Sequence, residues 1–324
     1  MERADIQDAA RRIAGHVRRT PVQVVDVGDP WLPAGGWLKL ELLQHTGTFK
    51  PRGAFNRILS AKERGELDPA VGIVVASGGN AGLANAYAAA SVGVPATVFV
   101  PTTSSPTKVR RLHEYGARVE QRGTEYADAY EAAMEHVAAT GAVYCHAYDQ
   151  PEIVAGAGTL GLELLEQLAE QMAGGRPELD TQLDTVLVAV GGGGLMAGVA
   201  TALDGVARVV AVEPERAPTL HEALAAGQPV DVAVSGVAAD SLGARRLGSI
   251  AWEVARRTQV TGALVGDEAI VDARRRVWDR YRVVLEAGAA APVAALLTGA
   301  YRPAAGERVA LVLCGANTDP SDLA

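Results

Sequence analysis

The sequence has little cysteine and no excess of positive charge. Only two of its 324 residues are cysteines, Cys145 and Cys314. This scarcity excludes a disulfide framework and a cysteine-rich metal site, and it favours a reducing cytoplasm. With 30 Lys and Arg against 38 Asp and Glu, the formal charge is −8, so the chain lacks the surplus of cations that nucleic-acid binding requires. The length predicts roughly two domains.

Long apolar runs that could cross a membrane are missing as well. Residues 71–107 and 185–203 contain no charge, but Pro95 and Pro101 interrupt the first segment and the glycines at 191–194 would break a helix across the second. The charged N-terminus has no apolar stretch of the kind found in secretory signals. Both uncharged segments are therefore interpreted as buried strand–loop–helix units, and we expect no membrane partner.

The pattern that is present is an alternation of β-rich and helical runs from about residue 70 onward, which indicates an α/β fold with parallel sheets. The expected strands span residues 72–76, 96–100, 118–121, 143–146, 185–190, 208–212 and 308–313. The clearest helix covers residues 126–137. In it, Tyr126, Tyr130, Met134 and Val137 recur on one face at helical spacing.

Nearer the N-terminus, apolar and charged residues alternate over residues 38–42. This pattern predicts a half-buried strand that turns Lys39 toward solvent. Pro51 suits the first turn of a helix over residues 52–64. Lys50 is therefore expected just before that helix.

Lysine is scarce, because the chain has only Lys39, Lys50, Lys62 and Lys108. Three of them are interpreted as solvated surface charges. Lys50 differs, since the dipole of the following helix and partial burial would both lower its pKa. The neutral amine that results could attack a carbonyl. An ordinary lysine of a surface loop is the alternative, and the local sequence does not decide between the two.

Two glycine-rich loops follow predicted strands. In the first, Gly191 to Gly194 separate a strand from a helix, so their backbone N–H groups could hold a phosphate. Met196 stands where a dinucleotide fingerprint needs its third glycine, which disfavours a dehydrogenase. The second loop, Ser77 to Gly82, offers N–H groups, a hydroxyl and an amide at the edge of a sheet where α/β proteins bind ligands. A tight turn with close helix packing is the alternative for the first loop, where phosphate binding is favoured, and an ordinary Gly-rich turn explains the second loop equally well.

Four motifs in order, LELLQHTGTFKPRGA, SGGNAG, GGGGL and LCGANTD, resemble those of the pyridoxal-phosphate enzymes with the tryptophan synthase β fold. The resemblance runs from about Thr20 to Asp319 and is strongest to the serine/threonine dehydratases, which are ammonia-lyases. It implies a larger domain from residues 1–46 and 149–324 and a smaller, mobile domain from 47–148, with the cofactor between them. A homodimer in the cytoplasm is expected from the same resemblance.

The resemblance also assigns roles to individual residues. Lys50 would be the catalytic lysine, covalently bound to pyridoxal phosphate in the resting enzyme. The remaining cofactor contacts would come from Phe49, Asn80, Gly191, Gly192, Gly193, Gly194, Gly236 and Cys314. The substrate would be received by Thr48, Ser77, Gly78, Asn80 and Ala81. Cys314 would face the pyridine nitrogen, where a thiol stabilises a pyridinium less than a carboxylate does.

Three positions depart from patterns found in other members of the family and indicate which branch the sequence resembles. Gly78 replaces the second serine of serine racemases, which disfavours racemisation, and Ala81 replaces the histidine common in threonine deaminases and racemases. Thr219 replaces the aspartate of members that bind divalent metals. A monovalent cation, such as potassium, is expected instead at Glu213, Ala217, Leu242 and Ala244. The alternative for Glu213 is a plain carboxylate at a strand end.

The expected reaction is loss of water and then ammonia from L-serine or L-threonine, giving pyruvate or 2-oxobutyrate. A β-replacement synthase of the cysteine-synthase kind, a dehydratase of a bulkier β-hydroxy amino acid and a non-catalytic phosphate-ligand binder are the alternatives. The resemblance covers nearly the whole chain and leaves no room for a regulatory domain, so we expect a role in amino-acid catabolism.

Overall fold

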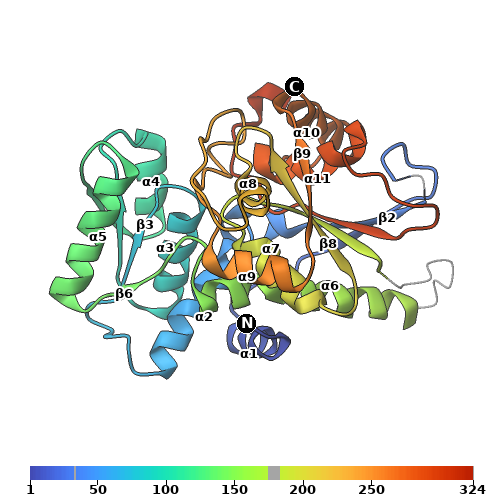
Figure 1. The fold of residues 1–324 in the computed structure, drawn as a ribbon. Coiled ribbons are helices and arrows are strands. Elements are labelled where there is room, and N and C mark those ends of the chain that lie inside the picture. Colours follow the sequence, from blue (N-terminus) through green and yellow to red (C-terminus); the bar gives the residue numbers. More distant parts are fainter. Residues whose placement is uncertain (33, 174–182, 324) are drawn as a thin grey trace.

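The computed structural model describes residues 1–32, 34–173 and 183–323 and divides them between two sheets (Figure 1). Among these residues, the larger sheet has the strand order β1 (Val22–Val25), β2 (Gly36–Lys39), β10 (Val309–Val312), β7 (Thr185–Ala189), β8 (Arg208–Pro214) and β9 (Thr261–Val265). The smaller sheet has the order β5 (Arg118–Gln121), β4 (Ala96–Val100), β3 (Ile73–Ala76) and β6 (Val143–Tyr144). Both sheets are parallel apart from β1, which pairs antiparallel with β2.

Helices cover both faces of each sheet, as parallel sheets require. On the larger sheet, α10 (Asp267–Tyr281) and α11 (Ala287–Thr298) lie on one side, and α6 (Pro151–Ala173), α7 (Gly194–Leu203) and α9 (Ser249–Arg257) lie on the other (Figure 1). On the smaller sheet, α5 (Tyr126–Thr140) covers one face, opposite α2 (Lys50–Glu63), α3 (Asn80–Val92) and α4 (Pro106–Glu114). The remaining helices are α1 (Arg3–Ile13) beside α6, and α8 (Thr219–Ala226) after β8.

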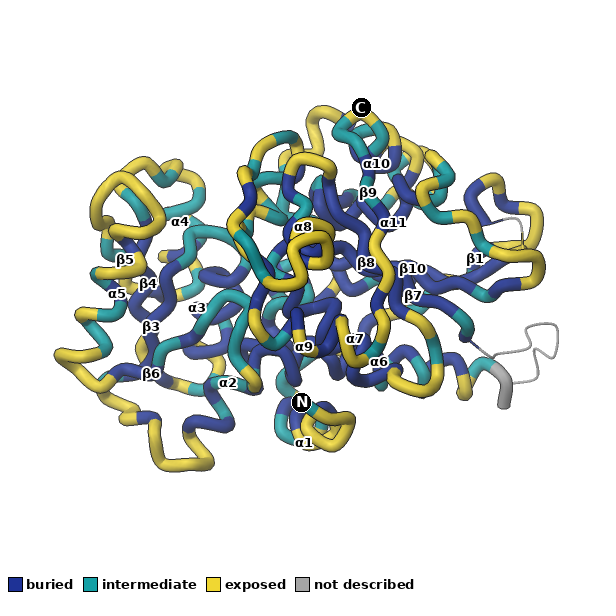
Figure 2. The backbone as a smooth tube through the Cα atoms, in the orientation of Figure 1, coloured by how far each residue is buried: buried dark blue, intermediate teal, exposed yellow. Residues whose placement is uncertain are grey.

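The strands β2, β3, β4, β7 and β10 are buried along their whole length (Figure 2), whereas the edge strands β1, β5 and β9 carry exposed residues. One large apolar cluster surrounds the larger sheet, and separate clusters fill the two faces of the smaller one. Among the described residues there is no helix with the length and apolar character that a membrane span needs. The α/β prediction is confirmed, and the strands expected from the sequence all form within a few residues of their predicted bounds.

The prediction that Lys39 faces solvent is wrong. Its side chain is fully buried, and its Nζ donates hydrogen bonds to the Thr20 carbonyl oxygen at 2.8 Å, to Glu163 at 2.6 Å and to Gln167 at 2.7 Å. The strand β2 ends at Lys39 and is covered on both faces, so alternation along it marks no exposed side.

Helix α5 forms as expected, but the residues it buries most are not those of the stripe that contains Tyr126 and Tyr130. Ala129 and Ala133 are the residues that this helix buries, whereas Tyr126 and Tyr130 are exposed. Small side chains let the helix lie close to the sheet, and the larger residues of the neighbouring stripe then project from its edge.

A buried ionic network links the start of α2 to its neighbours. The Arg52 guanidinium donates to Glu41 at 2.6 and 3.0 Å and lies 2.9 Å from a carboxylate oxygen of Glu163, which also accepts from Lys39. Arg52, Glu41 and Lys39 are each at most 1% exposed. Charges buried to this extent are tolerated only when each has a partner.

Removing one member of this network should therefore destabilise the protein strongly. We expect Arg52→Met to lower the free energy of unfolding by about 3–5 kcal/mol, because Glu41 would stay buried without its counter-ion. Arg276→Met, which breaks the exposed ion pair with Asp272, is the control and should cost less than about 1 kcal/mol. Urea unfolding followed by circular dichroism measures both. Equal losses in the two variants would contradict the stabilising role of the network.

Candidate active site

Lys50 is the first residue of α2, and the chain around it is held by a segment near the C-terminus. The Phe49 N–H donates to the carbonyl oxygen of Cys314 at 3.1 Å, and Thr48 forms an isolated β-bridge with Gly315. Pro51 in the first turn needs no partner for a backbone N–H. Lys50 and Cys314 are thus fixed beside each other by backbone hydrogen bonds.

The Lys50 amine occupies an environment with few polar partners. Its Nζ donates to the carbonyl oxygen of Ala147 at 2.8 Å and lies 4.9 Å from the centre of the Phe49 ring. Burial lowers its pKa to about 8, against smaller opposing contributions from Cys314 and Glu286. At pH 7 about a tenth of the amine is therefore unprotonated and nucleophilic, far more than for an ordinary lysine.

Cys314 supplies a neutral thiol next to this amine. Its side chain is 4% exposed, and burial raises its pKa, so the thiol stays protonated at neutral pH. A protonated thiol is a weak donor with no charge to offer a neighbouring ring.

Asn80, at the start of α3, belongs to a hydrogen-bonded chain that joins the two sheets. Its Nδ2 donates to the carboxylate of Glu286 at 3.0 Å, and its Oδ1 accepts from Asn317 Nδ2 at 2.8 Å. Asn317 also donates to the Thr46 carbonyl oxygen and accepts from Arg111, both at 2.8 Å. Burial raises the pKa of Glu286 to about 6, so it carries a negative charge at neutral pH.

Sequence reasoning missed Glu286 and Asn317 as functional residues. Glu286 stands at the N-cap of α11 without making a side-chain cap, and Asn317 belongs to the motif that contains Cys314. An acidic residue directly before an uncharged helix was the available signal for the first. Neither contact is visible in the sequence, since more than 200 residues separate Asn80 from each partner.

The glycine loop between β7 and α7 fits a small anion. Among the described residues, no acceptor takes the backbone N–H groups of Gly191 to Gly194, and α7 has no side-chain cap. A Cβ at Gly192 would lie 2.4 Å from the ring of Tyr148, and one at Gly194 would lie 2.6 Å from the Tyr148 carbonyl oxygen. The loop must stay free of side chains, and its donors remain available for a phosphate at a helix N-terminus.

The hydroxyls of Thr46 and Thr48 are buried with no hydrogen-bond partner among the described residues. Orphaned donors of this kind are costly in a native protein and indicate a position where a ligand completes the bonding. Ser77 lies after β3, where its Oγ accepts from the Gly79 N–H at 3.3 Å. Thr48 and Ser77 were both predicted to receive a substrate.

A cavity of about 340 Å³ opens between the two sheets beside these groups. Gly78 and Asn80 line it, together with Glu286. Ala81 is buried in the first turn of α3 instead, and Gly236 takes a φ of +83° beside Asp267. Of the predicted residues, Lys50, Phe49, Thr48, Cys314 and Asn80 thus share one connected neighbourhood.

The structure brings the four expected cation ligands together less clearly than the residues around Lys50. The carboxylate of Glu213 is fully buried and accepts from the backbone N–H groups of Leu220 at 2.7 Å and His221 at 2.9 Å, and from Thr219 Oγ1 at 3.1 Å. Thr219 Oγ1 also reaches the Gly191 carbonyl oxygen. This carboxylate therefore caps α8, and it has no Lys or Arg partner in the described part of the chain.

Of the other expected ligands, Ala217 is buried and Leu242 packs against Gly191. No backbone hydrogen bond within the described ranges joins Ala244 to the segment around Glu213. Three or more His, Cys, Asp or Glu side chains come together nowhere in those ranges as a metal site would require.

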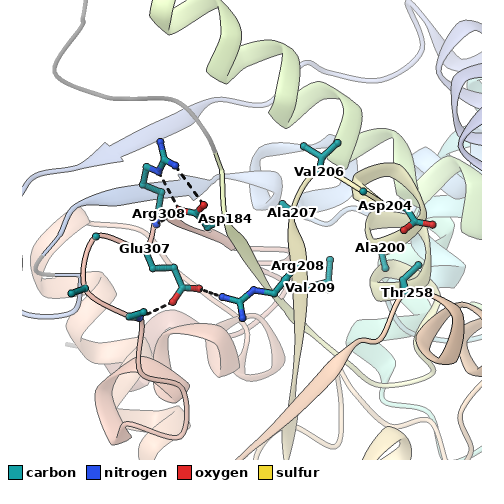
Figure 3. Close-up of a pocket in the computed structure, with 14 residues that line it drawn as sticks. Asp184, Ala200, Asp204, Val206, Ala207, Arg208, Val209, Thr258, Glu307 and Arg308 are labelled. Atoms are coloured by element: carbon teal, nitrogen blue, oxygen red, sulfur yellow. Dashed lines mark hydrogen bonds and ion pairs between the residues drawn. The ribbon is translucent and has the colours of Figure 1, made fainter.

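A larger hollow of about 620 Å³ lies at the opposite, amino-terminal edge of the larger sheet (Figure 3). Its charges are paired with each other: Arg208 lies 2.8 Å from Glu307, and Arg308 lies 3.1 Å from Asp184. No residue predicted for the site lines it. Size alone does not identify the functional cavity here.

Comparisons with known proteins agree with this geometry. The family described as pyridoxal-phosphate dependent enzyme matches residues 13–315. The chain is 35% identical to an L-threonine ammonia-lyase of Geobacter sulfurreducens, over 97% of this chain and 75% of that one, and 36% identical to a phenylserine dehydratase of Ralstonia pickettii, over 97% and 92%. The crystal structure of a T.th. threonine deaminase superposes with a TM-score of 0.87 at 36% identity, covering 98% of this chain and 99% of that one. The chain therefore belongs to the family of pyridoxal-phosphate-dependent enzymes.

Proposed function

We propose that this enzyme removes water and then ammonia from β-hydroxy-α-amino acids, including L-serine and L-threonine, and yields the corresponding 2-oxo acids. One observation carries the proposal: the buried Lys50 amine and the glycine loop meet at the same short segment, since Lys50 bonds to Ala147 and the next residue, Tyr148, packs on Gly192. An amine with a lowered pKa and a loop that can hold a phosphate thus lie together, next to the thiol of Cys314.

The residues present fit pyridoxal phosphate. The N–H groups of the glycine loop would hold its phosphate, and Asn80 and Cys314 would contact its ring, with Phe49 and Gly236 completing the surroundings. When bound, the cofactor supplies a conjugated ring that delocalises the electron pair left on the substrate's α-carbon. Thr48 and Ser77 would bind the substrate carboxylate, which places the α-proton before Lys50.

In the proposed site, protons are transferred on one face of the substrate, the face of Lys50. Lys50 is positioned to remove the α-proton as a general base. Gly78, which lines the cavity, has no group that could return a proton from the opposite face, and a Cβ there would lie 3.3 Å from Val100. This asymmetry favours elimination over racemisation.

The two sheets support the proposed division into a larger domain, 1–46 and 149–324, and a mobile smaller one, 47–148. Separate apolar clusters fill the two units, and the cavity lies between them. Closure of the smaller unit would exclude water from the reacting atoms. A cytoplasmic homodimer with a catabolic role completes the proposal.

Replacing the lysine tests the proposal directly. We expect Lys50→Ala to abolish the visible absorbance band of the lysine-bound cofactor and to slow 2-oxo acid formation from L-threonine by about 1,000-fold or more. Lys62→Ala, at the exposed end of the same helix, is the control and should retain both. The wild-type reaction should need no second substrate. A variant that kept the band and the turnover would refute the role of Lys50, and activity only after addition of a nucleophile would identify a β-replacement synthase.

The protonation of Lys50 predicts a pH dependence for cofactor binding. Only the neutral amine can attack the cofactor's aldehyde, so the rate of reloading the cofactor-free protein should rise through a midpoint near pH 8. The Glu286 carboxylate favours the ammonium form, so Glu286→Gln should lower that midpoint. Stopped-flow absorbance across a pH series measures both. An unchanged or higher midpoint in Glu286→Gln would show that this carboxylate does not act on the amine.

We propose a monovalent cation, such as potassium, near Glu213, Ala217, Leu242 and Ala244. The buried carboxylate of Glu213, which lacks a cationic partner within the described ranges, supports it, and Thr219 links this carboxylate to the glycine loop. Exchanging potassium for tetramethylammonium should then lower the melting temperature and reduce cofactor retention. Differential scanning calorimetry and cofactor absorbance after dialysis measure these changes. Identical values in the two salts would mean that Glu213 serves only as the cap of α8.

A further inference from the structure

The charges around the cavity of about 340 Å³ are not all compensated. Six charged side chains line it, and four of them form ion pairs, Lys108 with Asp240 and Arg274 with Asp322. Within the described ranges, the remaining two, Arg111 and Glu286, make no ion pair. One positive and one negative side chain thus line the cavity without a counter-ion in contact.

Two asparagines join these unpaired charges by hydrogen bonds. Arg111 Nη2 donates to Asn317 Oδ1 at 2.8 Å. Asn317 Nδ2 in turn donates to Asn80 Oδ1 and to the Thr46 carbonyl oxygen, both at 2.8 Å. Asn80 Nδ2 donates to both carboxylate oxygens of Glu286 at 3.0 Å. The four linked side chains, Arg111, Asn317, Asn80 and Glu286, form an amide relay.

The amide relay has one direction. A guanidinium can only donate hydrogen bonds, and an ionised carboxylate can only accept them. Arg111 and Glu286 therefore require each asparagine to turn its oxygen toward Arg111 and its NH2 group toward Glu286. The Thr46 carbonyl oxygen, which also only accepts, imposes the same direction on Asn317. If either amide turned over, oxygen atoms would face each other, and polar groups left without partners in this way are costly.

The direction of the relay determines what Asn80 offers to a bound cofactor. Asn80 is the first residue of α3, and it is the relay member that the proposed function places against the cofactor ring. One oxygen is attached directly to that ring, and it accepts hydrogen bonds when ionised. The NH2 group of Asn80 has two hydrogens, so it can donate one to this oxygen and keep the other on Glu286. In the opposite orientation the Asn80 carbonyl oxygen would repel the ring oxygen.

Arg111 reaches the relay from a helix that is largely exposed. Its neighbour on α4, Arg110, has a side chain that is 64% exposed and lies 3.8 Å from Glu114. Arg111 itself is half-buried, and Asn317 is its only hydrogen-bond partner in the described part of the chain. Asn317 follows β10 of the larger sheet, so it is held between α4 and α3, two helices of the smaller sheet, by Arg111 and Asn80.

We propose that Arg111 is a positioning residue for the cofactor: through Asn317 it fixes the orientation of the Asn80 amide, so that Asn80 presents an N–H group to the oxygen of the cofactor ring. The inference rests on the proposed function, because it concerns the site where the cofactor would bind. Arg111 directs a hydrogen bond without contacting the cofactor or the substrate, and no covalent bond changes in the relay.

The side-chain amides of the cofactor-free protein test the relay without any reaction. The chain has only four asparagines, which are Asn56, Asn80, Asn85 and Asn317. Labelling asparagine alone with a nitrogen isotope therefore gives four side-chain NH2 signals in a nuclear magnetic resonance spectrum. We expect Arg111→Met to shift the signals of Asn317 and Asn80. Asn56 and Asn85 donate to backbone carbonyl oxygens outside the relay, so their signals should stay in place.

Binding of pyridoxal phosphate tests the consequence of the relay. We expect Arg111→Met to weaken the affinity of the cofactor-free protein by about 10-fold, which corresponds to one lost hydrogen bond to a charged group. The visible absorbance band of the lysine-bound cofactor should also move. Arg111→Lys keeps a donor cation at the end of the relay and should recover part of the affinity. Arg110→Met, on the same helix, is the control and should change neither the affinity, the band nor the amide signals. Absorbance titration measures the affinity.

Asn317→Asp is the sharper variant, because it keeps the shape of the side chain and removes its donors. The introduced carboxylate can accept from Arg111 but cannot donate to Asn80, so the Asn80 amide should turn over and direct its oxygen toward the cofactor. The lost bond to Thr46 is offset by the new ion pair with Arg111, so we expect the melting temperature of the cofactor-free protein to stay close to the wild-type value. Cofactor affinity should nevertheless fall by at least about 10-fold. A lower melting temperature with unchanged affinity would show that the relay is only structural.

Three results would overturn the inference: a shift of the Asn317 signal alone in Arg111→Met, a shift of all four signals, or wild-type affinity and absorbance in both Arg111→Met and Asn317→Asp. The first would show that the effect does not reach Asn80, and the second would indicate a general change in folding. None of them bears on the elimination, which the 2-oxo acid assay tests separately. Relay-dependent cofactor binding without elimination of any β-hydroxy amino acid would support the role of Arg111 and refute the proposed reaction.

Discussion

The position of Lys50 depends on the buried ionic network one half-turn along the same helix. If Arg52 moved away from Glu41 and Glu163, unpaired charges would remain in the interior. The start of α2 therefore has a single stable location relative to β2 and α6. Hydrogen bonds from Phe49 to Cys314 then set the direction in which the lysine leaves the helix. The network holds the reactive amine in place without contacting it.

Two lysines lie away from bulk solvent, Lys39 fully buried and Lys50 partly buried, and they differ in their partners. Lys39 is surrounded by Glu163, Gln167 and a backbone carbonyl, and it is a structural cation. Lys50 has only a carbonyl oxygen within hydrogen-bond distance among the described residues, so burial is not compensated by a carboxylate contact. The difference between a structural and a reactive lysine lies in these partners.

Local signals in the sequence were sufficient for much of the fold and for parts of the site. A strand, a glycine turn and a helix in succession can be recognised from about ten residues of sequence, because the backbone conformation that needs glycine is local. Glu286 and Asn317 could not be found in this way, since they meet Asn80 only after the two sheets are assembled. Lys39 was misjudged for a related reason: alternation predicts one exposed face, and β2 has none. On α5, the pattern located the helix correctly, but close packing on the sheet selected the alanines and not the tyrosines.

The place of β10 in the larger sheet has a consequence for how the enzyme is made. This strand lies between β2 and β7, yet it is synthesised after both of them, and Asn317 just beyond it bonds to Thr46 across 271 residues. A growing chain on the ribosome therefore carries β2 and β7 with unpaired edges until β10 has been made, and such edges invite association with other chains. The smaller sheet has no such dependence and can form early. The surroundings of Lys50 depend on the same strand, because the Phe49 N–H and Thr48 pair with Cys314 and Gly315 directly after β10.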